Sequence, residues 1–329
     1  LWIKWNKNKL IKKFITYCLF FILSCNYLYS DSIKIGLGSC LDQDYPQPIW
    51  EAIEEESLNY FIFLGDNVYG DTPSGSLRKM KSAYDKQKKI LPNFLNEVQI
   101  YSIWDDHDYG LNDGGSDYKH KRKAQELYLN FWKISADDDR SNRDGIYFST
   151  NEVFFDKKFR FIFLDTRFFR SELKGKKSNY VENTDLDTTI LGDTQWEWFE
   201  NELKSDFDFL FIFSSIQIIA ENHRFEKWSN FPNERSKFFT LIDEFKDKTL
   251  LFSGDRHRAG IYKQDEIIEI TSSSMNKPGS SFDETDYYLI GETYPQENFT
   301  VLEIFENSIE IKIKDINGSV LNSIKRKYY

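Results

Sequence analysis

The chain has 329 residues, a formal net charge of −10 and an aromatic content of 17%, including 29 Phe and 19 Tyr. This is enough apolar material for a large buried core, so the composition excludes a disordered or fibrous protein. The acidic balance, without long basic tracts beyond the first residues, argues against a nucleic-acid partner held by bulk charge. The length suits one large domain or one domain with a small appendage.

The first 30 residues differ from the rest of the chain. Residues 1–13 contain five lysines and no acid, and an uncharged, mostly apolar stretch then runs from Phe14 to Ser30. A basic segment followed by a short apolar one is typical of a secretory signal, and the apolar part is short for a membrane span, which needs about 20 residues. We therefore expect an exported protein in which residues 1–30 are a signal peptide or N-terminal anchor and residues 31–329 form one domain.

Three fates of this segment are consistent with its sequence. The first is cleavage after Ser30, and the second is lipidation of Cys25, because Ile22-Leu23-Ser24-Cys25 loosely resembles a lipoprotein box. The third is retention as an anchor, so membrane contact is expected only through the N-terminal segment. Cleavage after Ser30 leaves Cys40 as the one cysteine, and a lone thiol in an exported protein is expected to be buried or metal-bound.

One pattern recurs along the chain: a short, continuous apolar run ends abruptly in a cluster of polar residues. Such runs are typical of strands buried on both faces. The runs are Ile33–Leu37, Tyr60–Leu64, Ile100–Trp104, Phe161–Leu164, Phe209–Phe213 and Thr249–Phe252. Helix-like segments between several of them are Pro48–Leu58, Leu77–Leu91, Lys119–Trp132, Thr194–Lys204 and Asn233–Phe245. This alternation predicts an α/β sheet whose ligand site lies at the carboxyl ends of the strands, with Asp193 as the N-cap of the fourth helix.

The C-terminal part is β-rich and has short turns such as Asn317-Gly318. The predicted strands are residues 258–263, 266–271, 298–305, 308–314 and 319–324. We expect these strands to be antiparallel and to close a second sheet. Two stacked sheets with helices outside make a four-layer αββα sandwich, which is the predicted fold.

The polar clusters after the predicted strands suit a metal centre. In phosphate-ester hydrolysis an anion must attack an anion, and two cations about 3.5–4 Å apart overcome this by neutralising the phosphate and generating hydroxide near neutral pH. Two of the four histidines, His107 and His257, lie in the Asp-rich clusters Asp105-Asp106-His107-Asp108 and Asp255-Arg256-His257. One such cluster alone indicates a solvated turn, whereas three clusters at three strand ends predict a metal site.

The polar clusters also form a series of motifs. In chain order they are Gly38-Ser39-Cys40, Leu64-Gly65-Asp66-Asn67-Val68-Tyr69, Trp104-Asp105-Asp106-His107-Asp108, Leu164-Asp165-Thr166-Arg167, Ser214-Ser215-Ile216-Gln217, the Glu226-Lys227-Trp228 to Glu234-Arg235 stretch and Ser253-Gly254-Asp255-Arg256-His257. This series resembles the PhoD-like alkaline phosphatase family, a branch of the calcineurin-like metallophosphoesterases. The resemblance implies an exported metal-dependent phosphoesterase that hydrolyses phosphate mono- or diesters, or both, by a metal-activated hydroxide.

The resemblance also implies a two-metal centre of Fe(3+) and Ca(2+), with other divalent metals as the alternative. Thiolate and phenolate are electron-rich anions that suit ferric iron, and oxygen ligands suit calcium. Asp66 is implied as the carboxylate that bridges the two metals. The other implied ligands are Cys40, Tyr69 and His257 for iron and Asp106 and Asp255 for calcium.

The implied catalytic group is His107, which contacts the phosphate or protonates the leaving group, with Asp105 or Asp108 as the carboxylate that orients it. Arg167 either holds a phosphate oxygen or makes a structural ion pair. The candidate substrate contacts are Asn112 and His223, and a purely structural loop is the alternative for His223. The chain departs from the wider superfamily in two places, because Gly-Ser-Cys replaces the first Asp-x-His motif and Asp106 replaces the Asn of its Asn-His pair.

Other hypotheses remain beside the phosphate-ester hydrolase. One is a phospholipid or nucleotide phosphodiesterase on the same site, so the expected partner is a small-molecule or lipid phosphate ester. Another is a non-catalytic metal-binding surface protein, which predicts loss of a key residue, yet Asp66, His107, Asp255 and His257 are all present. A dinucleotide-binding enzyme is disfavoured because no Gly-x-Gly-x-x-Gly turn follows the first strand.

Overall fold

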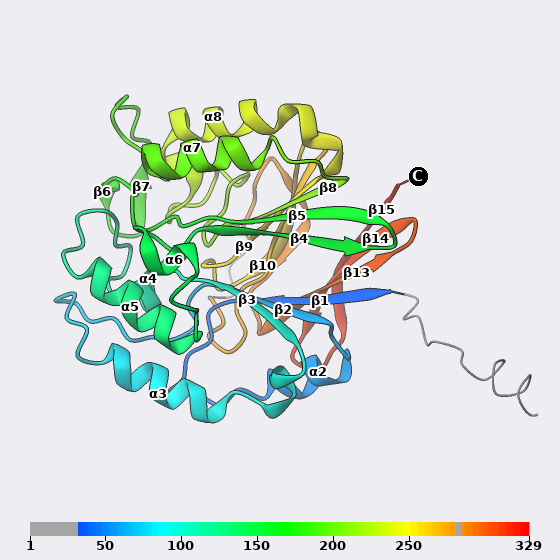
Figure 1. The fold of residues 1–329 in the computed structure, drawn as a ribbon, viewed down its shortest axis with the longest axis horizontal. Helices are drawn as coiled ribbons and strands as arrows, with labels where there is room; N and C mark the ends of the chain where they lie inside the picture. Colours follow the sequence, from blue (N-terminus) through cyan, green and yellow to red (C-terminus); the bar gives the residue numbers. More distant parts are fainter. Residues whose placement is uncertain (1–31, 281–283, 329) are drawn as a thin grey trace, which may run out of the picture. The chain divides into compact units, whose positions relative to one another are not determined.

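The computed structural model describes residues 32–280 and 284–328, so the signal peptide or anchor predicted for residues 1–30 lies outside the described residues. Two large sheets stack face to face, with α7 and α8 (Gly192–Glu202 and Pro232–Ile242) on the outer face of one and α2 and α3 (Ile49–Glu55 and Met80–Ile90) on the outer face of the other (Figure 1). The predicted four-layer αββα sandwich is confirmed. In the part of the chain that the structure describes, no helix has the length and apolar character needed to cross a membrane.

The first sheet has six strands. They are β1 (Ile33–Gly38), β2 (Tyr60–Leu64), β3 (Gln99–Ile103), β13 (Asn298–Phe305), β14 (Ser308–Asp315) and β15 (Val320–Lys327). Their order across the sheet is β15-β14-β13-β1-β2-β3. The three strands β1, β2 and β3 run parallel, whereas β13 pairs antiparallel with β1.

The second sheet has seven strands, and a short hairpin lies apart from both sheets. The seven are β4 (Phe148–Phe154), β5 (Lys157–Phe163), β8 (Phe209–Phe213), β9 (Thr249–Ser253), β10 (Ala259–Gln264), β11 (Ile267–Thr271) and β12 (Leu289–Tyr294), and the hairpin is β6 (Lys174–Lys176) with β7 (Asn179–Val181). The order of the seven strands across the second sheet is β12-β10-β11-β9-β8-β5-β4. The neighbours β5, β8, β9 and β11 run parallel, so their carboxyl ends share one edge.

The prediction that the C-terminal strands close the second sheet by themselves is wrong. They divide between the two sheets: β10, β11 and β12 extend the sheet of β5, β8 and β9, while β13, β14 and β15 extend the sheet of β1. Leu302 of β13 lies opposite Ile35 of β1. Without β13, the parallel core of the first sheet would end in unpaired backbone groups on β1, and such an edge is costly when buried.

The five predicted helices are present, with ends that differ from the prediction by a few residues. The helical segments besides α2, α3, α7 and α8 are α4 (Asp106–Tyr109), α5 (Lys121–Phe131), α6 (Asp139–Asn142) and the 3-10 turns η1 (Asn93–Asn96), η2 (Trp228–Asn230) and η3 (Asp243–Lys248). The N-cap prediction for Asp193 is wrong, because α7 already begins at Gly192. Asp193 lies in the first turn instead, where its charge still favours the helix dipole.

Strand β8 shows how the layers are held together. Phe211 and Phe213 face the core between the two sheets, and Leu210 and Ile212 face the core beneath α7 and α8. The ring of Phe213 stacks between two others, with centroids 4.5 Å from Phe163 on β5 and 5.0 Å from Phe252 on β9. These stacked rings fix the three strands relative to one another just before the loops that carry the site.

Replacing Phe213 with alanine should remove the central ring of this stack. Because Phe213 is buried, we expect Phe213→Ala to lower the free energy of unfolding by about 3–5 kcal/mol. Denaturant titration followed by tryptophan fluorescence measures this change. Val153→Ala, at a side chain that is 64% exposed on β4, is the control and should stay within about 0.5 kcal/mol of the wild type. Equal stability of both variants would contradict a structural role for the stack.

Candidate active site

The candidate residues lie on loops at the carboxyl ends of the parallel strands. Cys40 follows β1, Asp66 follows β2, and Asp106 begins α4 three residues after the end of β3. Asp255 and His257 follow β9 in the other sheet. Parallel strands end at a common edge, and here the edges of both sheets meet, so residues far apart in sequence converge.

The backbone at these positions is held in an uncommon conformation. Cys40, Asp66, Asp255 and His257 have φ values of 57°, 52°, 64° and 51°. Non-glycine residues in this left-handed region cost free energy and concentrate at functional sites. The backbone strain at these four positions lowers local stability, and the same conformation directs the four side chains toward one site.

Gly65 allows the loop after β2 to approach the loop after β3. Its φ is 99°, and a Cβ atom there would lie 2.6 Å from the Cβ of Asp105. Any other residue would be strained in the backbone and would push the two loops apart. The Gly-Asp pair of the motif thus brings Asp66 next to the Asp105–Asp106 loop.

A first group of ligand atoms forms around Asp66. One ligand atom each from Cys40, Asp66 and His257 lies within 4.8 Å of the others. The hydroxyl of Tyr69 lies 3.1 Å from Asp66 Oδ2 and 3.2 Å from His257 Nε2. The structure therefore brings together Asp66, the carboxylate expected to bridge the metals, and the three residues expected to bind iron.

A second group of ligand atoms lies beside the first. It consists of Asp105, Asp106 and Asp255, whose oxygens also fall within 4.8 Å of one another. A third group of the same size, Asp66, Asp106 and His107, connects the two. Asp106 and Asp255 are the residues expected to bind calcium, whereas Asp105 was expected only to orient His107.

Two carboxylate oxygens in the second group indicate that the site is suited to bind cations. Asp105 Oδ2 and Asp106 Oδ1 are buried and have no hydrogen-bond partner among residues 32–280 and 284–328. Buried, unpaired carboxylate oxygens are costly unless a cation binds them. The donor set of three aspartates, with a thiol, a phenol and an imidazole across Asp66, fits a two-metal centre.

His107 is oriented by a residue that the sequence analysis did not single out. Its Nδ1 lies 2.7 Å from Asp71 Oδ1, and its backbone N–H donates to Asp66 Oδ1 at 3.2 Å. No hydrogen bond joins the ring to Asp105 or Asp108 in the described part of the chain. Asp71 lies two residues after Tyr69, at the end of the sequence Gly-Asp-Asn-Val-Tyr-Gly-Asp. A second carboxylate this close to the predicted ligands was the sequence signal that could have identified Asp71.

Asp108 has a different task. Its carboxylate accepts the backbone N–H of Asp105 at 2.5 Å and that of Asn67 at 3.1 Å. It also caps the short helix α4 in a reciprocal capping box with Asp105. Asp108 therefore fixes the loop that presents Asp106 and His107, and it acts on the backbone rather than on the His107 ring.

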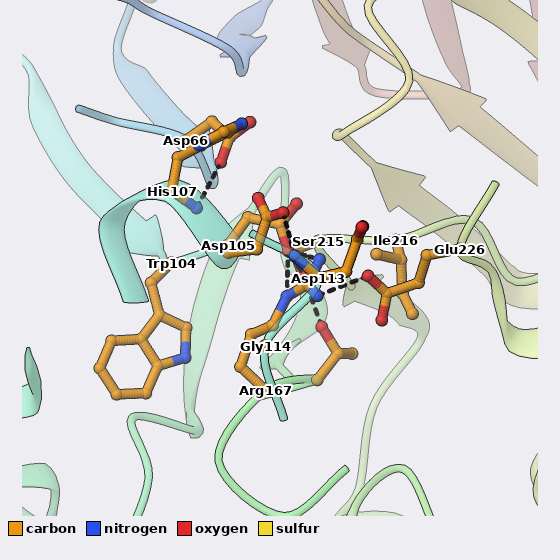
Figure 2. Close-up of polar contacts among 12 residues, drawn as sticks. Asp66, Trp104, Asp105, His107, Asp113, Gly114, Arg167, Ser215, Ile216 and Glu226 are labelled. Carbon is orange, nitrogen blue, oxygen red and sulfur yellow. Dashed lines mark hydrogen bonds and ion pairs between the residues drawn. The ribbon is translucent and has the colours of Figure 1, made fainter. Parts of the chain in front are cut away.

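Arg167 lies beside Asp105 of the second ligand group, as Figure 2 shows. Its side chain is 0% exposed and its Nε donates to Asp105 Oδ1 at 2.6 Å. Glu226 accepts from Arg167 at 2.5 Å and pairs with Arg170 at 2.7 Å. Because the guanidinium is fully covered and held by two carboxylates, this geometry favours the structural ion pair over a phosphate contact.

The two candidate substrate contacts line different cavities. Asn112 lines a cavity of about 290 Å³ together with His107 and Asp255, which we call the catalytic cavity. His223 lines a neighbouring cavity of about 460 Å³. The structure therefore places Asn112 beside the metal-binding groups and His223 outside that space.

The pattern of these motifs matches a known family. The family model described as PhoD-like phosphatase matches residues 35–300. The chain belongs to the PhoD-like phosphatase family. It is therefore a metal-dependent hydrolase that acts on phosphate esters, which agrees with the converging ligand groups.

Solved structures support the same fold. A structure of PhoD has a TM-score of 0.67 at 13% identity and covers 90% of this chain and 68% of that chain. GAP50 of Plasmodium, described as the anchor in the inner membrane complex, has a TM-score of 0.60 at 14% identity, covering 91% and 89%. Purple acid phosphatase PPD1 from yellow lupin (Lupinus luteus) seeds has a TM-score of 0.58 at 15% identity, covering 90% and 54%. No curated protein matches the chain by sequence.

Burial sets the protonation of the ligands in this PhoD-like phosphatase. It raises the pKa of Asp66 well above its usual range, and the nearby carboxylate of Asp106 raises it further. Burial and the charge of Asp66 likewise raise the pKa values of Cys40 and Tyr69. Burial raises the pKa of Asp105 to about 7, although the guanidinium of Arg167 opposes it. Because burial favours the protonated form of each of these groups, metal binding here is expected to be coupled to proton release.

Metal binding should therefore depend on pH. The carboxyl group of Asp105, with a pKa of about 7, carries a proton below neutral pH, so we expect the affinity for Ca(2+) to increase as the pH rises from about 6 to about 8. Binding should also release protons. Calorimetric titration in two buffers of different ionisation enthalpy measures both quantities. A pH-independent affinity without proton release would show that these groups are not the ligands.

Proposed function

We propose that this protein is an exported phosphoesterase with a mixed Fe(3+)/Ca(2+) centre that hydrolyses phosphate mono- or diesters. The observation that carries the proposal is the position of Asp66, with one oxygen 3.1 Å from the Tyr69 hydroxyl and the other 3.2 Å from the backbone N–H of His107. It therefore lies between the two ligand groups, where a bridging carboxylate belongs. The basic and apolar stretch in residues 1–30 supports export.

The donor types support the choice of metals. The group with Cys40, Tyr69 and His257 offers a thiolate, a phenolate and an imidazole, which suit ferric iron. The group with Asp105, Asp106 and Asp255 offers only oxygen, which suits calcium. Bound there, the two cations would neutralise the phosphate and supply hydroxide near neutral pH.

A side chain of the protein then protonates the leaving group. His107 lines the catalytic cavity, and burial alone would lower the pKa of its ring. The carboxylates of Asp106, Asp66 and Asp71 outweigh burial and raise the pKa well above its usual range. A protonated imidazole at the mouth of the metal site can give its proton to the departing alcohol oxygen, so His107 is the general acid.

Removing the bridging carboxylate tests the proposal. We expect the wild type to bind about one iron per chain and to hydrolyse p-nitrophenyl phosphate or its bis ester in the presence of calcium. Asp66→Asn keeps the side-chain shape but should lose both the metal and the activity. Metal analysis by plasma mass spectrometry and release of p-nitrophenol measure the two effects, and the ratio of mono- to diester rates identifies the preferred substrate.

Asp187→Asn, at an exposed position outside both cavities, is the matched control and should keep metal and activity. Turnover that survives in Asp66→Asn would disprove the bridging role. A wild-type protein that stays metal-free after reconstitution and hydrolyses neither ester would instead support a non-catalytic surface protein.

Asp71 provides a test of the general acid. Asp71→Asn removes the negative charge that faces His107 Nδ1, so the pKa of His107 should fall and the high-pH limb of kcat should move to lower pH. The loss of kcat should be about tenfold or more for an alkyl phosphate and smaller for p-nitrophenyl phosphate, whose leaving group needs less protonation. Initial rates between about pH 5 and 9 measure both effects.

Asp137→Asn, at an exposed residue before α6, removes the same charge away from the site. Its pH profile should match the wild type. An equal loss of kcat for good and poor leaving groups in Asp71→Asn would mean that Asp71 supports only the loop structure and that His107 does not donate the proton.

A further inference from the structure

A second cavity adjoins the catalytic cavity. It has a volume of about 460 Å³, and Phe225 lines both spaces. Tyr262 and Leu289 form other parts of its wall, and Arg224 and His223 also line it. An ester whose phosphorus lies at the metal site therefore has room to extend its alcohol part past Phe225 into this space.

Positively charged side chains surround the shared wall. The guanidinium carbon of Arg256 lies 4.8 Å from the Phe225 ring centroid, and that of Arg224 lies 5.3 Å from it. Arg224 forms no ion pair with any carboxylate of the described residues. Lys227 Nζ donates to the carbonyl groups of His223 and Phe225, at 2.5 Å and 3.3 Å. Within residues 32–280 and 284–328, neither of these two cations forms an ion pair with a carboxylate.

The acids that line the second cavity are already engaged. Glu284 pairs with Arg256 and lies 3.7 Å from Arg258, so one carboxylate serves two guanidinium groups. The carboxylate of Asp286 accepts three backbone N–H groups, from Glu221, Asn222 and Tyr288. The cavity wall itself carries Arg224 against Glu284 and Asp286. Counting the adjacent Arg256, Arg258 and Lys227, four described cations face these two carboxylates, although the chain as a whole carries −10.

Two titratable groups in or near the cavity have lowered pKa values, with burial as the first cause and neighbouring cations as the second. Burial lowers the pKa of His223 well below its usual range, and the charges of Arg256, Lys227 and Arg258 lower it further. Burial, followed by the charge of Arg256, lowers the pKa of Lys227 to about 8. Of the two causes, only the neighbouring cations favour an anionic ligand.

We propose that this second cavity binds the alcohol part of the substrate and selects alcohols that carry a carboxylate or a second phosphate. Phe225, Tyr262 and Leu289 contact the carbon skeleton, and Arg224 binds the anionic group with its planar, forked donors. The chemistry is unchanged: the oxygen of a water-derived hydroxide bonds to phosphorus, the P–O bond to the alcohol breaks, and the alcohol oxygen receives its proton from His107. This assignment rests on the proposed phosphoesterase function.

Matched substrate pairs test the assignment. Glycerol 3-phosphate and 3-phosphoglycerate differ by a carboxylate, and fructose 6-phosphate and fructose 1,6-bisphosphate differ by a phosphate. We expect the wild-type holoenzyme to prefer the anionic member of at least one pair by about tenfold in kcat/KM, the effect of one charge-assisted hydrogen bond. Phosphate release at constant ionic strength measures the preference, and the pair that shows it distinguishes a carboxylate from a phosphate ligand.

Arg224→Gln should remove most of this preference, and the change should appear in KM rather than in kcat. Arg224 is exposed, so the substitution leaves the core intact. Arg122→Gln removes the same charge from a side chain that is 73% exposed and outside both cavities, and it should keep the wild-type preference. Leu289→Trp, which narrows the cavity, should raise KM for the anionic substrates more than it changes inhibition by inorganic phosphate.

The outcomes separate this assignment from the proposed function. A wild type that hydrolyses both members of each pair equally well, with Arg224→Gln indistinguishable from it, would overturn the assignment and leave the phosphoesterase standing. A wild type that hydrolyses no phosphate ester after metal loading would overturn the proposed function and this assignment with it. A preference lost equally in Arg122→Gln would show that bulk charge, not the cavity, selects the substrate.

Discussion

Mutual repulsion among buried carboxylates is the constraint on which the site depends. Asp66, Asp105, Asp106 and Asp255 meet at the edge where the two sheets join, and such a cluster is unstable without positive charge. The buried guanidinium of Arg167 holds Asp105 by one oxygen, and the other oxygen has no hydrogen-bond partner among the described residues (Figure 2). The remaining negative charge is what makes this edge a binding place for metals.

The rest of the structure serves to keep these charges in place. Glu226 holds both Arg167 and Arg170, so the guanidinium of Arg167 cannot turn away from Asp105. Four ligand residues stand in left-handed backbone conformations, a cost that the stacked aromatic core between the sheets offsets. Rigid strands therefore end in strained loops, and the stability of the layers keeps the ligands oriented before any metal binds.

Much of the fold could be predicted because its signals are local. Continuous apolar runs gave the buried strands, and the spacing of apolar residues gave the five main helices. Sheet membership could not be predicted in the same way. Strand β13 pairs with β1 although about 260 residues separate them in sequence, and that choice is made by the need to cover a buried sheet edge, which no local pattern records.

The sequence by itself determined the chemistry of the site, because residue types at strand ends fix which ligands are available: a thiol, a phenol, imidazoles and carboxylates. Only the tertiary structure decided how these groups divide their tasks. It placed Asp71 rather than Asp105 or Asp108 beside the His107 ring, moved Asp105 among the metal-binding oxygens, and buried Arg167 in an ion pair. Such roles depend on distances of a few ångströms between distant loops, and those distances arise from packing, which the linear order of residues does not state.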